Sequence, residues 1–289
     1  MEFDLIELIR TRCSVARADV RLGIGDDAAL LLPPAGHELA VSTDTLVAGV
    51  HFPLGTSARD LGWKALAVNL SDLAAMGATP AWALLSLTLP ESAREFVDGF
   101  AQGFAELAAQ HGVALVGGDT TRGPLAVGVT VHGFVPPGRA LRRDGARAGD
   151  LVFVTGTLGD AAAGLRCLDR ADERAAALFN APSDTREALV GRLNRPTPRI
   201  AAGAALRELA SACIDVSDGL LADLGHDRGD RSSACQRECC SEAANEGCSP
   251  HQNAPFPECP TIGQHTSEPA GGATGACPDS GCRPDRTAP

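Results

Sequence analysis

The chain is almost without lysine and entirely without tyrosine. Lys64 is the only lysine in 289 residues, and aromatic side chains make up 4% of the sequence. A P-loop uses a lysine that follows its glycines, and protein kinases use one on a strand beside the nucleotide. Both of these nucleotide-binding classes are therefore excluded. If the chain binds phosphate groups, their charge must be neutralised by metal ions, arginine side chains or backbone N–H groups.

Several other familiar patterns are also missing. No Ser–His–Asp or Cys–His arrangement stands out, and no His or Cys pair with zinc spacing precedes residue 227. No apolar stretch is long enough to cross a bilayer, and the N-terminus has no signal-peptide pattern, so we expect a cytoplasmic protein. The net charge of −11 argues against a nucleic-acid or membrane partner and suits a protein that collects divalent cations.

Large apolar residues almost disappear after residue 226. Residues 227–289 contain only Phe256 and Ile262 of the Leu, Ile, Val, Phe and Met class, whereas seven of the ten cysteines lie there. These cysteines include no CxxC pair, and their odd number makes a poor disulfide framework. Such a segment cannot bury enough apolar surface to offset its ordering entropy, so we expect a disordered Cys/Pro/Gly-rich tail.

The most informative stretch is a run of four oxygen-bearing side chains, Ser42–Thr45, which follows the apolar residues 39–41. Such a run is unsuited to a core, but hydroxyl and carboxylate oxygens are the ligands that Mg²⁺ prefers. Similar oxygen-rich pieces occur elsewhere, at Gly25–Asp27, Ser71–Asp72, Gly117–Thr121 and Asp215–Gly219. We expect these loops to converge on metal ions that hold a nucleoside triphosphate.

Each of these pieces also has a purely structural interpretation. Gly25–Asp27 and Gly117–Asp119 could both be simple hairpin turns. Asp72 could cap a second, shorter helix after a break at Ser71, and Ser217 could cap the helix that follows it.

Two further features lie near these pieces. His51 closely follows the Ser42–Thr45 run, and a structural role and a substrate contact are equally open for it. A basic cluster in this acidic chain could clamp a phosphate or simply face solvent, and it comprises Arg139, Arg142, Arg143 and Arg147.

The hydrophobic pattern predicts strands that alternate with helices. We expect helices at residues 2–10, 57–76, 92–110 and 187–210, the last broken near Pro196 and Pro198. We expect strands at 20–32 (as a hairpin), 39–41, 82–90, 114–116 and 125–134, and, after a break at 136–138, at 151–155 and 213–215.

Several of these motifs together resemble one enzyme family. They are Gly23–Ala29, Ser42–Thr45 with Gly49 and His51–Phe52, Lys64–Gly77, Gly117–Gly123, Val154–Thr157 and Ile214–Gly219. Across residues 3–226 the chain resembles the thiamine-monophosphate kinase family, which belongs to the larger group that includes aminoimidazole ribonucleotide synthetase. The resemblance implies ATP-dependent phosphorylation of thiamine monophosphate to thiamine diphosphate, with several Mg²⁺ ions.

The resemblance also implies roles for individual residues. Metal ligation would come from Asp27, Ser42, Thr43, Asp44, Asp72, Asp119, Asp215 and Asp218. ATP contacts would come from Gly118, Asp119, Arg143 and Ser217, and a substrate contact from His51. No general base is identified among them, and none is needed. The acceptor phosphate is already ionised near neutral pH, since its second pKa is about 6, and direct in-line transfer follows.

The implied fold is of the α+β class. Residues 1–138 would form an N-terminal ATP- and Mg²⁺-binding domain, a mixed sheet or half-barrel with flanking helices, through which a homodimer forms. Residues 139–226 would form an incomplete C-terminal α/β domain, and residues 227–289 the disordered tail.

The family pattern stops after Gly225–His226. Family members continue with a further α/β segment that includes a Gly-Gly-Glu-Asp-Tyr-type loop, and nothing like it is present here. The composition of the tail suggests an out-of-frame reading of a GC-rich gene. Two alternatives therefore stay open: an inactive or impaired nucleotide-binding homodimer that lacks the C-terminal half, or an enzyme of the same superfamily with another acceptor.

Overall fold

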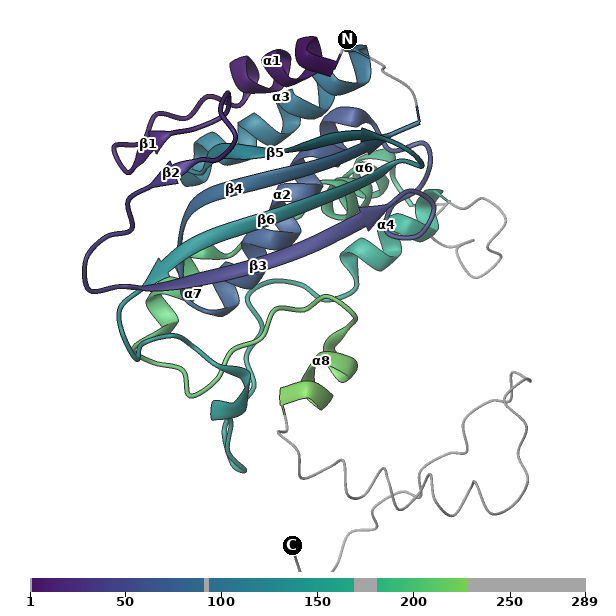
Figure 1. Ribbon diagram of the computed structural model, residues 1–289. Coiled ribbons are helices and arrows are strands. Elements are labelled where there is room, and N and C mark those ends of the chain that lie inside the picture. Colours follow the sequence, from purple (N-terminus) through teal and green to yellow (C-terminus); the bar gives the residue numbers. More distant parts are fainter. Residues whose placement is uncertain (1, 91–93, 169–180, 228–289) are drawn as a thin grey trace, which may run out of the picture. The chain divides into compact units, whose positions relative to one another are not determined.

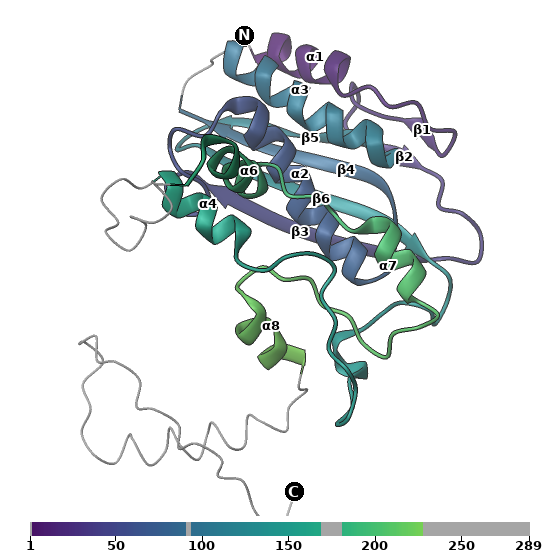
Figure 2. The same ribbon diagram turned by 180° about the vertical axis from the view of Figure 1, so that it is seen from behind.

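The computed structural model describes residues 2–90, 94–168 and 181–227, which all belong to one compact unit, Met1–Glu238. A four-stranded mixed sheet carries helices on one of its faces, as Figures 1 and 2 show from opposite sides. The predicted α+β class, with a mixed sheet and flanking helices, is confirmed. The predicted disordered tail begins at residue 227, but Asp227 still belongs to a helix, and residues 228–289 lie outside the described residues.

The sheet has two edge strands that run in the same direction. Its order is β3 (Glu38–Val47), β6 (Ala126–Val135), β4 (Thr79–Leu89) and β5 (Ala114–Arg122). β6 is antiparallel to both of its neighbours, and β4 and β5 are parallel. All four strands were predicted, but β3 was expected only at 39–41 and continues through the Ser42–Thr45 run, which is part of the ladder with β6. β5 is longer than expected, because Gly117–Arg122 continue the ladder with β4 instead of forming a loop at the strand end.

Two long helices cover one face of the sheet, α2 (Ala58–Ala75) and α3 (Arg94–His111), and α1 (Glu2–Arg12) packs on α3. Side chains alternate between the faces of a strand, and those that point toward the helices form the main core, among them Leu85 and Val129. None of the helices in the described residues combines the length and apolar character that crossing a membrane requires.

The start and the course of α2 follow from a few residues. The Oγ atom of Ser57 accepts a hydrogen bond from the N–H of Asp60 at 3.1 Å, so Ser57 caps the helix as predicted. The helix then continues without a break to Ala75. Asp72 therefore lies inside α2, and the alternative that it caps a second helix is wrong.

α2 and α3 approach each other so closely that two positions accept only glycine. A Cβ atom at Gly62 would lie 2.0 Å from the carbonyl oxygen of Phe100, and one at Gly103 would lie 1.7 Å from that of Arg59. Real Cβ atoms stay beyond 3.0 Å from such atoms. The two helices therefore pack backbone against backbone, and this contact fixes the position of α2.

The other face of the sheet is covered at one end by a short hairpin. The hairpin consists of β1 (Val20–Leu22) and β2 (Leu30–Leu31), as predicted. It packs on Trp82 and Phe134, whose rings meet edge to face with centroids 5.0 Å apart. The glycine-rich loop between β1 and β2 is thus held on the face opposite α2.

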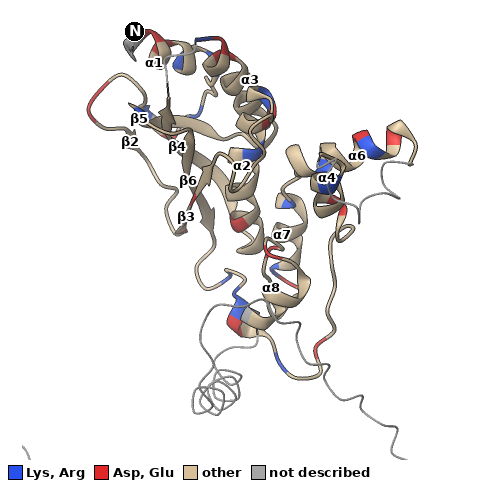
Figure 3. Cartoon of the chain, turned by 90° about the vertical axis from the view of Figure 1, so that its right-hand side faces the viewer, with Lys and Arg blue, Asp and Glu red and all other residues tan. Residues whose placement is uncertain are grey.

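Residues 136–168 and 181–227 form short helices joined by irregular segments. They are η1 (Arg143–Gly145), α4 (Asp160–Leu168), α6 (Ser183–Asn194), α7 (Ile200–Leu206) and α8 (Leu220–Asp227). The predicted break of the 187–210 helix near Pro196 and Pro198 is confirmed. Figure 3 shows that α4 and α6 carry charges of both signs.

The strands predicted at 151–155 and 213–215 were wrong, since neither stretch is extended in a ladder. The side chains of Leu151 and Phe153 are 80% and 83% exposed. A strand forms only beside another strand that satisfies its N–H and C=O groups, and the described residues supply no such neighbour here. The apolar run is therefore strand-like in composition but not in structure.

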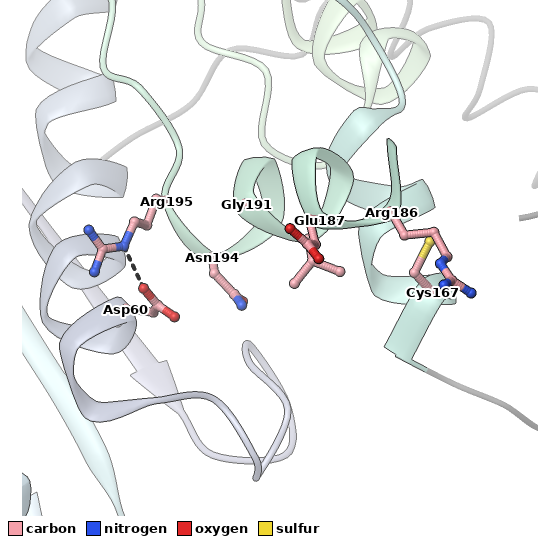
Figure 4. A pocket seen from close by; sticks show the side chains of 8 residues that line it. Asp60, Cys167, Arg186, Glu187, Gly191, Asn194 and Arg195 are labelled. Carbon is pink, nitrogen blue, oxygen red and sulfur yellow. Dashed lines mark hydrogen bonds and ion pairs between the residues drawn. The ribbon is translucent and has the colours of Figure 1, made fainter. Parts of the chain in front are cut away.

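The end of α6 is fastened to α2 by Arg195. Its Nε atom donates to Asp60 at 2.5 Å, and its guanidinium carbon lies 5.4 Å from the ring centroid of Trp63. The indole N–H of Trp63 donates to the carbonyl oxygen of Pro196 at 2.9 Å. Figure 4 shows the Asp60–Arg195 pair at one side of a pocket of about 510 Å³ that Asn194 also lines. This ion pair holds the end of α6 against α2.

Candidate functional site

Three predicted metal ligands come together at one edge of the sheet. Asp44 lies on β3, Asp72 on α2, and Asp215 in the loop before α8. Partial burial raises the pKa of all three carboxyl groups. A neighbouring carboxylate raises each pKa further: that of Asp44 by Asp215, that of Asp72 by Asp44, and that of Asp215 by Asp72. We call these three residues the acidic cluster.

Asn69 fixes Asp44 relative to α2. Asn69 is buried in the helix, and its Oδ1 atom accepts the N–H of Asp44 at 2.9 Å. Its Nδ2 atom donates to the carbonyl oxygen of Ala65, also at 2.9 Å. Both ends of the amide therefore have partners, and one side chain links β3 to the helix that carries Asp72.

The substitution Asn69→Leu is expected to lower the free energy of unfolding by about 1–3 kcal/mol, because it removes two partnered hydrogen bonds in a buried place. Denaturant titration measures this loss. Gln102→Leu is a matched control, since Gln102 donates to Asp98 on α3, away from the cluster. We expect a change within about 0.5 kcal/mol for the control. Equal losses in the two variants would contradict the role given to Asn69.

Asp72 is held by a hydroxyl group and faces a positive charge. The Oγ atom of Ser42 donates to its Oδ2 atom at 2.5 Å. Although burial raises the pKa of Asp72, this hydrogen bond and the nearby guanidinium of Arg143 lower it. Arg143 therefore lies beside the acidic cluster.

Two other arginines of the predicted basic cluster are already paired within the chain. Arg139 forms an ion pair with Glu208, and Arg142 forms one with Asp144. Their charges are neutralised locally and are exposed to solvent, which favours the surface interpretation for both.

Asp223 shapes the loop that presents Asp215. Asp223 is 4% exposed, and its Oδ2 atom accepts the N–H groups of Ser217 and Gly219 at 3.0 and 3.1 Å. The loop is thus folded back on the first turn of α8. Ser217, a predicted ATP contact, takes part in this turn through its backbone.

Asp215 is itself anchored to α2. Burial and the charge of Asp72 raise its pKa, whereas a hydrogen bond from the side chain of Ser71 lowers it. Asp218 lies in the same loop with its side chain exposed. The loop therefore brings one carboxylate into the cluster and leaves a second at the surface.

His51 lies beside the acidic cluster on the loop after β3. Burial raises the pKa of Asp44, but His51 lowers it, which places the ring near that carboxylate. The Nδ1 atom of His51 accepts the N–H of Val47 at 3.0 Å. A neutral ring whose Nδ1 is an acceptor carries its proton on Nε2, so His51 offers an N–H donor at the surface.

Gly118 and Asp119 lie on the opposite edge of the sheet. Gly118 pairs with Leu85, Leu85 with Val129, and Val129 with Asp44, so one row crosses all four strands. At about 4.8 Å per strand, Gly118 is about 14 Å from Asp44 along the sheet. Asp119, the next residue on β5, therefore does not join the acidic cluster of its own chain.

Gly118 has a structural reason to be glycine. Its φ angle is +150°, and a Cβ atom there would lie 1.8 Å from the carbonyl oxygen of Leu85. The close approach of β5 to β4 requires glycine whether or not a ligand binds. The residue type therefore does not by itself indicate a nucleotide contact.

Asp27 and Thr43 also point away from the cluster. Asp27 is exposed in the loop between β1 and β2. The Oγ1 atom of Thr43 donates to the carbonyl oxygen of Val129 at 3.2 Å and accepts from Thr130 at 3.0 Å. Ser42 and Thr43 are successive residues of a strand, so they face opposite sides of the sheet, and Ser42 is the one that faces Asp72.

The cluster has suitable donors for a divalent cation, but they are not drawn together around one point. In the described part of the chain, no three His, Cys, Asp or Glu side chains are grouped closely enough to hold one ion. The carboxylates and the Ser42 hydroxyl are nevertheless hard oxygen ligands of the kind that Mg²⁺ takes together with phosphate oxygens and water. The pKa values of the three carboxyl groups are raised first by burial and then by the neighbouring carboxylates, and a bound cation would offset both effects. The donor set therefore fits Mg²⁺.

Residues 25–135 match the family described as AIR synthase related protein, N-terminal domain. The thiamine-monophosphate kinase of Escherichia coli K12 is 52% identical over 225 residues, which make up 78% of this chain and 67% of that relative. The chain belongs to the thiamine-monophosphate kinase family. The predicted family is thus confirmed, and the chain spans about two thirds of the length of this relative. A relative of the same name from Bacillus subtilis is 41% identical over 228 residues, 77% of this chain and 68% of the relative.

Solved structures agree with this assignment. Thiamine-monophosphate kinase from Stenotrophomonas maltophilia K279a matches with a TM-score of 0.71 and 56% identity, over 79% of this chain and 72% of that chain. AaThiL complexed with AMPPCP and TMP matches with a TM-score of 0.61 and 35% identity, over 78% and 69%. The sheet and helices that position the acidic cluster are thus shared with these kinases.

Sequence reasoning placed Ser71 among the oxygen-rich pieces but did not predict the anchoring roles of three residues that hold the site. Asn69, Ser71 and Asp223 each hold a loop or strand of the cluster. The signal for Asn69 was available, since it is an amide three residues before Asp72 in an apolar helix and needs buried partners. Asp223 carries no comparable local signal, because its partners become evident only when the 215–219 loop folds back.

Proposed function

We propose that this chain transfers the γ-phosphoryl group of ATP to the phosphate of thiamine monophosphate, giving thiamine diphosphate and ADP. The observation that carries the proposal is the acidic cluster beside Arg143 and His51, in a chain of the thiamine-monophosphate kinase family. The related AaThiL structure in complex with AMPPCP and TMP supports the same pair of substrates. Membership of this family also identifies the chain as a kinase.

We assign cation binding first to the acidic cluster and Ser42. When bound there, Mg²⁺ would neutralise phosphate charge and hold the transferring group in line. The acceptor is a phosphate oxygen that is ionised near neutral pH, so no residue has to remove a proton. Arg143 would face the nucleotide phosphates, and the Nε2–H of His51 would donate to the acceptor phosphate.

The remaining predicted ligands belong to the same proposal. The exposed carboxylate of Asp218 lies in the loop of Asp215 and can reach an ion through water or phosphate oxygens. Asp27, Thr43 and Asp119 lie away from the cluster of their own chain and stay predicted ligands, and Gly118 and Ser217 stay predicted backbone contacts to ATP.

The position of Asp119 supports a homodimer. β3 and β5 are the free edges of the sheet and run in the same direction, and an edge strand can pair with a second chain. Leu39 and Val41 of β3 are 48% and 54% exposed on the open face, which is apolar surface that a partner would cover. We propose that β5 of a second copy lies beside β3, so that Asp119 of that copy approaches Asp44.

Mixing two inactive variants tests this composite site. Asp44→Asn and Asp119→Asn are each expected to be inactive alone. A hybrid dimer of the two has one site with both lesions and one site with none. An equal mixture, dissociated and reassembled, should therefore regain about a quarter of the wild-type activity. No recovery in a mixture that forms hybrid dimers would place both aspartates in one chain's site.

Turnover by the purified chain tests the function itself. The chain, ATP and Mg²⁺ are incubated with thiamine monophosphate, and thiamine diphosphate is measured by chromatography. Unphosphorylated thiamine is the matched control, because it lacks the acceptor phosphate, and we expect no product from it. ATP binding without thiamine diphosphate would favour the inactive nucleotide-binding dimer, and product from a different acceptor phosphate would favour another enzyme of the superfamily.

A further inference from the structure

The single lysine of the chain is buried beneath the loop that carries His51. Lys64 lies on α2 and is 9% exposed, and its Nζ atom donates to the carbonyl oxygen of His51 at 3.3 Å. Burial lowers the pKa of its ammonium group, and no carboxylate in the described part of the chain offsets this effect. A buried charge without an opposite partner reduces stability. Lys64 therefore needs an explanation other than stabilisation of the fold.

The loop above Lys64 is built so that its backbone determines the His51 ring. The N–H of His51 donates to the carbonyl oxygen of Val47 at 2.9 Å, and the N–H of Val47 donates to the ring Nδ1 atom at 3.0 Å. The N–H of Gly49 donates to the carbonyl oxygen of Phe52 at 2.9 Å, and Phe52 is 4% exposed. The buried Phe52 anchors the end of the loop. Lys64 holds the carbonyl group of His51, which lies between the His51 ring and Phe52.

We propose that Lys64 is a positioning residue for the acceptor substrate. By holding the carbonyl oxygen of His51, it keeps the loop in the one conformation in which Val47 fixes the ring tautomer. The Nε2–H of His51 is then presented to the phosphate of thiamine monophosphate. This inference rests on the proposed function and adds to it a residue that touches neither substrate.

Lys64→Met removes the charge and the hydrogen bond and keeps the length of the side chain. We expect the KM for thiamine monophosphate to rise on the order of tenfold, the size of one hydrogen bond to a charged group, with kcat and the KM for ATP nearly unchanged. The melting temperature should stay level or rise, because a buried charge is gone. Leu66→Met is the matched control, since it places methionine at a fully buried position of the same helix, and it should change neither KM.

A double-mutant cycle separates positioning from a merely structural role. In a His51→Ala background, Lys64→Met should raise the KM for thiamine monophosphate no further, because the ring on which it acts is absent. An equal rise in both backgrounds would overturn the proposal.

A second measurement does not depend on turnover. Ring ¹⁵N NMR shifts of His51 should show one neutral tautomer, protonated on Nε2, in the wild type and a mixture in Lys64→Met. Loss of the single tautomer in a chain that makes no thiamine diphosphate would keep the positioning role and reject the proposed function. An unchanged tautomer in Lys64→Met would reject the positioning role, whatever the activity.

Discussion

Asp44→Asn is expected to lower the rate of thiamine diphosphate formation on the order of 10³-fold and, at the same time, to raise the melting temperature at pH 7. A cation held by this carboxylate would stabilise the transition state by several kcal/mol, and each 1.4 kcal/mol is a factor of ten in rate. Asparagine keeps the size of the side chain and the backbone N–H that Asn69 accepts. Turnover and thermal unfolding of one preparation measure both effects.

The gain in stability follows from the direction of the pKa shifts. A carboxyl group whose pKa is higher in the folded chain binds its proton more tightly there than in the unfolded chain. Stability therefore falls as the pH rises from the ordinary carboxyl pKa of 3.8 through the raised value of Asp44. The wild type and Asp44→Asn should melt at similar temperatures below this window and diverge above it.

Mg²⁺ should reverse the difference in melting temperature between the wild type and Asp44→Asn. At pH 7 the ion should raise the melting temperature of the wild type more than that of Asp44→Asn, because binding to the folded state alone is stabilising. Asp98→Asn is the control, since Asp98 pairs with Arg12 at the surface, and it should keep both activity and the Mg²⁺ response. An active Asp44→Asn enzyme would remove the acidic cluster from the proposed mechanism.

Gly103→Ala is expected to cost about 3 kcal/mol or more of the free energy of unfolding, at the upper end of overpacking effects. The new methyl group would have to occupy space that the carbonyl oxygen of Arg59 fills, so α3 must move away from α2. Denaturant titration gives the loss directly.

A change from glycine to alanine at another helical position should raise the free energy of unfolding instead of lowering it. Gly191 lies in α6, and no atom lies within 4 Å of a Cβ atom built there. Alanine costs less backbone entropy than glycine in a helix, so Gly191→Ala should stabilise by about 0.5–1 kcal/mol. If both variants lost the same free energy, close packing of α2 and α3 would not be the reason for glycine at 103.

The sheet and the long helices could be predicted because their residues obey local rules. The capping Ser57, the alternating β6 and the apolar α2 each carry their own signal. Of the oxygen-rich pieces, those that carry Asp44, Asp72 and Asp215 lie near enough for the carboxylates to raise one another's pKa, and metal binding by them stays a prediction. Asp119 could not be placed in the same way, because its distance from Asp44 depends on the order and register of four strands.

The strands predicted after residue 136 did not form, because local sequence does not supply their partners. Leu151–Val154 has the composition of a buried strand, but composition does not supply the neighbouring strand that a ladder needs. Sequence patterns there describe what a segment can do in a suitable environment, and tertiary partners decide whether it does so.

Helix α2 contacts three parts of the proposed site. Lys64 reaches the loop of the acceptor, Asn69 reaches the edge strand, and Asp72 reaches toward the nucleotide, while Gly62 presses the same helix onto α3. The packing of α2 against α3 therefore sets the positions of all three residues at once. A small loosening of the contact between α2 and α3 would change the affinities for acceptor, cation and nucleotide together, in a chain that is still folded.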